Sequence, residues 1–318
     1  MAAMESTSRK ERRLVRGMGL SPCERLKVPS GAIERASAML QRPRSNYNGV
    51  GAAGWSGGGA NMPWAKSGDG IDIYYEAHGL EEAAAPCLVF AHGAGGNATS
   101  WFQQVPAFAA SHRIAVFDHR GFARSICPAE QQSAARFEDD LATVMDAVGM
   151  DRATIVCQSM GGWTGVRAAV NRRDRVEAVF LANTPGAIRN DVTVANMAQM
   201  AERLAAAGGL VNRAYSAEFG ARNPVGALLY RQISAYNTQA RPNIRDDSVY
   251  VSADQAKATG VPFHMLSSDL DPLFPPEVLQ AVAADIDAPM THVEGAGHST
   301  YFEMPDEFNA ALRAFLNR

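Results

Sequence analysis

The stretch Thr154-Ile155-Val156-Cys157-Gln158-Ser159-Met160-Gly161-Gly162-Trp163 decides the fold of this 318-residue chain. Its apolar first half leads through a serine with small neighbours into a helical pattern, which predicts a strand, a tight turn and a helix. Such a turn lifts the serine hydroxyl above the sheet and aims a helix N-terminus at it. An oxyanion forming there would meet backbone N–H groups and a favourable dipole. Ser159 is therefore the candidate nucleophile.

Cys157 stands where the G-x-S-x-G pattern of such turns has its first glycine. A cysteine side chain is small, so we expect a slightly crowded turn and a buried structural thiol. Trp163 could border a substrate cavity, but a tryptophan beside an apolar run is more often part of the core.

Short apolar runs alternate with helical patterns along most of the chain. The runs expected as strands are Ile71–Ala77, Cys87–Ala91, Arg113–Phe117, Ala153–Cys157, Ala178–Ala182, Pro262–Leu266 and Met290–Val293. The helical patterns cover Ser100–Ala110, Ser133–Val148, Gly162–Asn171, Pro276–Ala284 and Pro305–Leu316. Continuous apolar runs indicate strands buried on both faces. The alternation predicts an α/β fold with a mostly parallel central sheet flanked by helices.

Residues 187–254 break this alternation. They contain helical runs such as Val194–Ala207 and no clear strand. In parallel α/β sheets, ligands bind beyond the carboxyl ends of the strands, where an insertion at this point would lie. We therefore expect a helical cap inserted before the strand that carries the candidate acid.

A nucleophilic serine needs a histidine that takes its proton and a carboxylate that orients this histidine. Among seven histidines, His298 has the most suitable setting, because a glycine-rich loop carries it after the strand expected at Met290–Val293. Two carboxylates, Asp271 and Asp269, follow the preceding strand. Asp271 is the predicted acid and Asp269 the alternative. The chain order serine, acid, histidine agrees with the order known for this kind of turn.

An oxyanion needs two N–H donors, and one is expected from Met160 after the serine. The second is expected from the glycine loop His92-Gly93-Ala94-Gly95-Gly96, with Ala94 as the candidate and Gly95 as the alternative. Small residues let the backbone of such a loop approach a substrate closely. The loop lacks the lysine of a P-loop and the G-x-G-x-x-G spacing, which argues against a nucleotide site.

Residues 62–318 resemble the α/β-hydrolase superfamily, particularly its esterase-like and 3-oxoadipate enol-lactonase-like members. The resemblance rests on His92-Gly93-Ala94-Gly95, Asp118-His119-Arg120-Gly121-Phe122-Ala123-Arg124-Ser125, the Ser159 turn, Asp271 and Gly297-His298. It implies hydrolysis of a small to medium carboxylic ester or lactone through an acyl-enzyme, without a metal or organic cofactor. The same fold also hosts cofactor-free oxygenases, perhydrolases, lyases and slow-turnover ligand receptors, and the sequence does not separate these alternatives.

Two positions depart from the resembled family. Ala123 stands where relatives usually have glycine, which implies a tightened structural turn. Ser299 follows His298 where the carbon–carbon bond hydrolases commonly have tryptophan, and this disfavours a meta-cleavage-product hydrolase. A serine at position 159 also disfavours epoxide hydrolases and haloalkane dehalogenases, which use aspartate there.

Composition limits the partners of the chain. It is 47% hydrophobic and 20% charged, with a formal net charge of −3, so no basic face for nucleic acid is indicated. Four cysteines without a C-x-x-C pair suggest neither a zinc site nor a disulfide framework. No apolar run is long enough to span a membrane. We expect a cytoplasmic protein with a small-molecule substrate, and the sequence does not indicate its oligomeric state.

Residues 1–61 differ in composition from the rest of the chain. Residues 1–44 have ten Lys/Arg against four Glu, and the glycine-rich stretch Gly49–Gly59 follows. Such a segment has few apolar side chains to bury, so we expect it to be disordered. It could instead be an organelle-targeting peptide, although its glutamates argue against that, or translation could begin at Met62.

Overall fold

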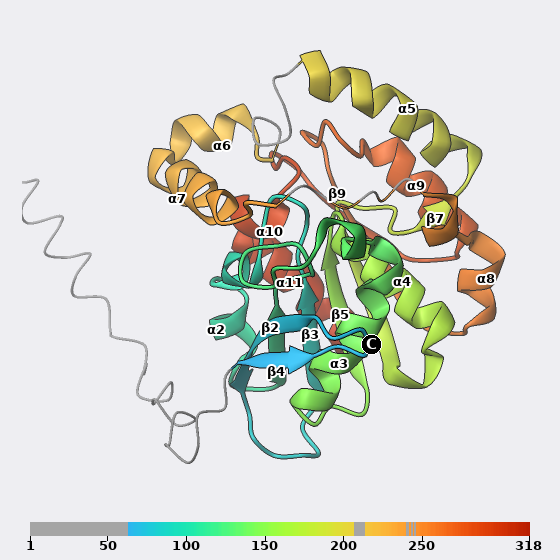
Figure 1. Ribbon diagram of the computed structural model, residues 1–318. Helices are drawn as coiled ribbons and strands as arrows, with labels where there is room; N and C mark the ends of the chain where they lie inside the picture. The colour runs from blue at the N-terminus through green and yellow to red at the C-terminus, as the bar shows by residue number, and fades with distance from the viewer. Residues whose placement is uncertain (1–62, 207–213, 240–241, 243, 245) are drawn as a thin grey trace, which may run out of the picture. The chain divides into compact units, whose positions relative to one another are not determined.

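The computed structural model of the protein describes residues 63–206, 214–239, 242, 244 and 246–318. The expectations for residues 1–61 lie outside these described residues. A central sheet with helices on both faces forms the domain (Figure 1). Among the helices that the structure describes, none is both long and apolar enough to cross a membrane.

The sheet has eight strands in the order β1-β2-β4-β3-β5-β6-β9-β10. Their bounds are β1 Trp64–Lys66, β2 Asp72–Gly79, β3 Cys87–Ala91, β4 Arg113–Phe117, β5 Ala153–Gln158, β6 Val176–Ala182, β9 Phe263–Ser268 and β10 Met290–Val293. Strand β2 pairs antiparallel with both β1 and β4, and the pairs from β4 to β10 are parallel. The predicted mostly parallel sheet is confirmed.

The helices form the outer layers. They are α2 Val105–Phe108, α3 Phe137–Ala147, α4 Gly161–Asn171, α5 Asp191–Ala206, α6 Ala217–Arg222, α7 Pro224–Ala235, α8 Ala253–Ala258, α9 Pro276–Asp285, α10 Thr300–Glu303 and α11 Pro305–Leu316. Every residue of β3 and of β5 is buried. Alternate side chains of β5 enter two separate cores: Ile155 packs in the core with α3, α4 and α9, and Val156 in the core with α2 and α11. This explains why these strands are apolar throughout.

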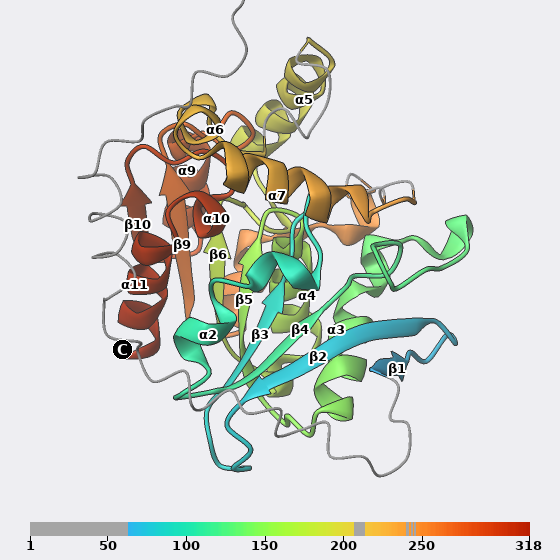
Figure 2. The same ribbon diagram turned by 90° about the vertical axis from the view of Figure 1, so that its left-hand side faces the viewer.

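The chain between β6 and β9 contains α5, α6 and α7. Figure 2 shows α6 and α7 above the carboxyl ends of the parallel strands. The expectation of no strand within residues 187–254 was wrong, because β7 Ile188–Arg189 and β8 Val251–Ser252 form a two-stranded parallel ribbon. Two-residue strands are too short to produce a readable period.

The helix expected over Ser100–Ala110 is replaced by two shorter elements. A 3₁₀ turn covers Ala98–Trp101, with Asn97 as its N-cap, and α2 follows with a proline in its first turn. Proline fits the first turn of a helix but cannot continue one from a preceding segment. The proline at position 106 therefore accounts for the break.

Candidate active site

Ser159 lies in the sharp turn between β5 and α4. Its φ of +50° is in the left-handed region that non-glycine residues rarely adopt, as expected for a strained turn that presents the side chain. Small residues follow it for a steric reason. A Cβ at position 161 would come within 2.1 Å of the Ala91 carbonyl oxygen, so only glycine fits there. The turn thus lies against the end of β3.

Cys157 takes the glycine position of the turn without exposing its thiol. The side chain is fully buried and faces α4, where a Cβ at Gly165 would lie 2.4 Å from the Cys157 Sγ. The glycine at position 165 therefore leaves the room that the Cys157 side chain needs. Burial raises the pKa of the Cys157 thiol, which keeps it protonated near neutral pH. This environment suits the structural thiol that the sequence suggests.

His298 and Asp271 lie together on two neighbouring loops. The Nδ1 atom of His298 is 2.9 Å from Oδ2 of Asp271, and both side chains are buried. The other oxygen of Asp271 accepts hydrogen bonds from the N–H groups of Leu273 and Phe274. Asp269, the alternative acid, instead accepts a hydrogen bond from the Gly295 N–H at an exposed position. The structure therefore brings Asp271, and not Asp269, to His298.

Two residues without a sequence motif complete this arrangement. Asn183, just after β6, donates from Nδ2 to Oδ2 of Asp271 at 3.2 Å and to Oγ of Ser268 at 2.7 Å. Gln158, the residue before Ser159, donates from Nε2 to the carbonyl oxygen of His298 at 2.9 Å. These bonds connect the ends of β5, β6 and β9 to the loop that carries His298, called the histidine loop below. In the sequence, the only feature that could have pointed to Gln158 and Asn183 is that each is a polar residue at the carboxyl end of a buried strand.

The glycine loop after β3 lies directly beside Ser159. A Cβ at Gly93 would be 2.9 Å from the Cβ of Ser159, so glycine permits this close approach. Ala94 follows it and is partly exposed, as is Ser159, whereas Met160 is buried at the start of α4. The structure thus places both residues predicted to donate to an oxyanion next to Ser159. Their roles stay predictions.

Two buried histidines hold this loop. His92 accepts a hydrogen bond at Nε2 from the His119 N–H, at 2.9 Å, so its Nδ1 carries the proton and donates to the Gly93 carbonyl oxygen at 2.8 Å. Burial lowers the pKa of His92 to about 4 and lowers the pKa of His119 well below its ordinary value. Both rings are therefore neutral near pH 7, in agreement with the acceptor role of His92 Nε2.

We expect the free energy of unfolding to fall as the pH drops from 6.5 to 4. An unfolded histidine binds a proton near pH 6.5 but His92 only near pH 4, so the unfolded state holds more protons in this window. The contribution of His92 is about 3 kcal/mol over the whole window. Urea titrations at pH 7 and pH 5 would measure the loss, and the His92→Asn variant should lose less. An equal loss in both proteins would contradict the assignment.

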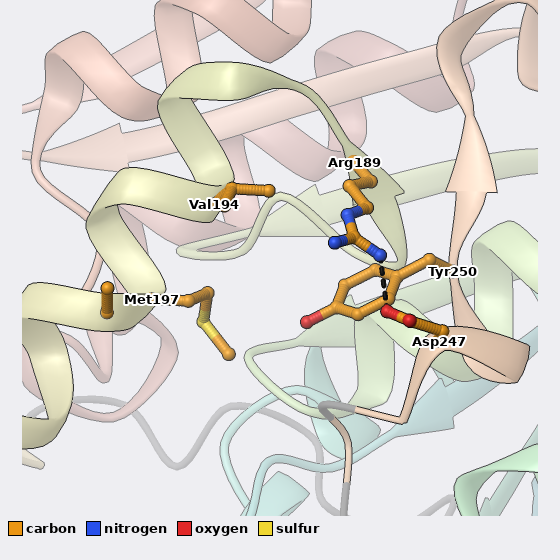
Figure 3. Close-up of a pocket in the computed structure, with 6 residues that line it drawn as sticks. Arg189, Val194, Met197, Asp247 and Tyr250 are labelled. Atoms are coloured by element: carbon orange, nitrogen blue, oxygen red, sulfur yellow. Dashed lines mark hydrogen bonds and ion pairs between the residues drawn. The ribbon is translucent and has the colours of Figure 1, made fainter.

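A cavity of about 190 Å³ lies between the first and last parts of the segment that joins β6 to β9 (Figure 3). It is lined by Arg189, Val194, Met197, Ala198, Asp247 and Tyr250. Figure 3 shows Arg189 paired with Asp247 beside the ring of Tyr250. Trp163 is 1% exposed and its ring centroid lies 6.5 Å from that of Tyr250. Trp163 is thus a core residue and does not line this cavity.

Known proteins share both the sequence pattern and the architecture. The family model of the alpha/beta hydrolase fold matches residues 86–305. RutD of Azorhizobium caulinodans, assigned as a carbamate hydrolase, is 37% identical over 122 residues, which are 38% of this chain and 44% of RutD. The matched segment thus spans less than half the length of this curated relative.

Solved structures match over most of the chain. The enol-lactonase from Burkholderia xenovorans LB400 has a TM-score of 0.66 and 26% identity, over 80% of this chain and 100% of the enol-lactonase. A thermophilic esterase from Thermogutta terrifontis has a TM-score of 0.66 and 24% identity, over 80% of this chain and 97% of the esterase, and shows the likeness of fold alone. Because the family model covers more than half of its residues, the chain belongs to the alpha/beta hydrolase fold family.

Proposed function

We propose that this protein is a serine hydrolase that cleaves a small to medium carboxylic ester or lactone through an acyl-enzyme. Ser159 attacks the carbonyl carbon, and His298 takes the hydroxyl proton and returns it to the leaving alcohol. Water then attacks the acyl-enzyme with His298 as the base. Asp271 orients the imidazole, and the N–H groups of Met160 and Ala94 stabilise the oxyanion. No step calls for a metal or an organic cofactor.

The contact between His298 and Asp271 carries this proposal. Because Oδ2 of Asp271 receives the Nδ1–H of His298, the Nε2 atom is the one left to accept a proton from a serine. The backbone carbonyl oxygen of His298 itself accepts a hydrogen bond from Gln158, the residue before Ser159. The bond from Gln158 supports a position of the His298 loop beside the turn of Ser159, and the chain order serine, acid, histidine is the one that this fold uses.

The similar proteins support acyl chemistry at this site. The enol-lactonase that matches this chain opens, by its name, a cyclic ester, and RutD is assigned to a carbamate, in which a nitrogen lies on the same carbonyl carbon. Esters, lactones and carbamates all react through a tetrahedral intermediate at a carbonyl carbon. We propose that helices α6 and α7 act as the cap that selects among them, because they lie above the strand ends.

A panel of chromogenic esters, lactones and carbamates tests the proposal. We expect turnover of an ester or lactone by the purified protein. With an open-chain ester whose acyl-enzyme is hydrolysed more slowly than it forms, release of the alcohol should begin with a burst equal to the number of enzyme molecules. Turnover of carbamates alone would change the substrate class but keep the mechanism. Tight binding of panel members without a burst or turnover would refute the hydrolase and favour a ligand receptor.

A further inference from the structure

Glu303 has a buried carboxylate next to the loop that carries His298. It ends α10 and is 6% exposed. Its Oε2 accepts a hydrogen bond from the Gly297 N–H at 3.0 Å, and its Oε1 accepts one from the Ser299 N–H at 3.3 Å. The backbone on both sides of His298 is therefore held by one carboxylate.

The same carboxylate also binds the segment inserted between β6 and β9. Oε2 accepts hydrogen bonds from the N–H of Ser216 at 3.0 Å and from its Oγ at 2.7 Å. Ser216 is the N-cap of α6, and its Oγ in turn accepts a hydrogen bond from the Phe219 N–H. A Cβ at Gly297 would lie 2.6 Å from the Ser216 nitrogen, so the two backbones are in close contact. Figures 1 and 2 show α6 near α10 in both views.

Helix α7 and the residues just after it make similar bonds to the glycine loop and to Asn97, which follows that loop. Asn97 donates from Nδ2 to the Ile233 carbonyl oxygen at 2.9 Å, and Asn237 donates from Nδ2 to the Gly96 carbonyl oxygen at 3.0 Å. Tyr230 of α7 is also close, because a Cβ at Gly95 would lie 2.5 Å from its hydroxyl oxygen. The insertion therefore contacts both loops that flank Ser159.

A buried carboxylate is stable only when hydrogen-bond donors replace the water that it has lost. The four donors given above are two from the histidine loop and two from Ser216. Loss of the Ser216 donors would leave Glu303 under-satisfied, and a shift of its side chain would release the Gly297 and Ser299 N–H groups. Because catalysis falls steeply with small displacements of a proton acceptor, this would reduce the rate more than substrate binding.

We propose that Glu303 is a positioning residue through which the inserted helix α6 fixes the loop of His298. This inference rests on the proposed role of His298 as the base. It makes the insertion more than a cover that selects substrates, since α6 then contributes to the geometry of the reacting groups. The bonds between Ser216 and Glu303 connect α6 to the loop of His298.

The test compares two N-cap serines. Ser216→Ala removes the α6 cap and one donor to Glu303, whereas Ser252→Ala removes the cap of α8, whose Oγ accepts a hydrogen bond from the Gln255 N–H. We expect both variants to lower the Tm through the lost cap, and Ser216→Ala to lower it more, because it also removes a donor to the buried Glu303 carboxylate; kcat is therefore compared per folded molecule. Only Ser216→Ala should lower kcat, by roughly threefold to tenfold with KM nearly unchanged. Glu303→Ala should lower kcat by roughly 100-fold, and Glu303→Gln should restore part of it because its amide oxygen still accepts.

Hydrogen–deuterium exchange makes the result independent of any substrate. Amides of residues 295–299 should exchange faster in Ser216→Ala than in the wild type and stay unchanged in Ser252→Ala. If the wild type hydrolyses nothing in the panel, the proposed function fails, while the exchange result still decides whether Ser216 positions this loop. Equal exchange in both variants, or equal kcat per folded molecule, would overturn the inference.

Discussion

Ser159→Ala is expected to abolish hydrolysis, with a loss in kcat on the order of 10⁶-fold. The Ser159 hydroxyl is the side-chain group that forms a covalent bond with the substrate in the proposed mechanism, and alanine offers no substitute for it. A fluorophosphonate probe should label the wild type once per molecule and should not label the variant. Intact-mass spectrometry would count the labels, and peptide mapping would place them.

Ser252→Ala serves as the control for this experiment, because Ser252 is an exposed N-cap on α8. It should be labelled like the wild type. Labelling of Ser159→Ala at another residue would remove Ser159 as the nucleophile. A variant that is neither labelled nor folded would be uninformative by activity alone, so the melting curve belongs to the same experiment.

Asp271→Asn should reduce kcat by about 10⁴-fold, because an amide in this position favours the wrong tautomer of the histidine. The substitution is nearly isosteric, and its remaining oxygen can still accept the hydrogen bonds that Leu273 and Phe274 donate to Asp271. Kinetics on the best ester or lactone of the panel, together with the labelling rate, would measure the loss. The fold should therefore survive while the catalytic rate does not.

Asp269→Asn is the matched control in the same loop. Its carboxylate binds the Gly295 N–H at an exposed position, so we expect a change of about threefold or less. A larger loss in Asp269→Asn than in Asp271→Asn would assign the acid to position 269. It would also mean that the loop rearranges when substrate binds.

The fold could be predicted because burial on both faces leaves a strong mark on a strand. The buried strands β3 and β4 have the predicted bounds, and β5 extends one residue further than predicted. Strand β10 also has the predicted bounds, although only one of its four residues is buried. The turn at Ser159 and the loops of Asp271 and His298 were readable because small residues and strand ends mark them locally. The proline at position 106 does mark the break before α2 in the sequence, whereas the short ribbon of β7 and β8 leaves no comparable mark.

The supporting residues of the site could not be predicted in the same way. Gln158 and Asn183 each bond to partners 85 to 140 positions away in the chain, and Glu303 binds Ser216 at a separation of 87. No local period or spacing encodes such pairs. In the sequence alone, Glu303 is an ordinary charged residue two positions before a proline, and nothing marks its carboxylate as buried.

The packing of Cys157 against Gly165 constrains the order in which the two positions can change. With the thiol in place, any side chain at position 165 meets the sulfur, whereas a glycine at position 157 would free that space. Substitution at 157 must therefore come before substitution at 165 along any path of folded intermediates. The departure from the usual serine motif is thus one half of a coupled pair: a lineage that carries the cysteine must keep the glycine on α4 for as long as the cysteine remains.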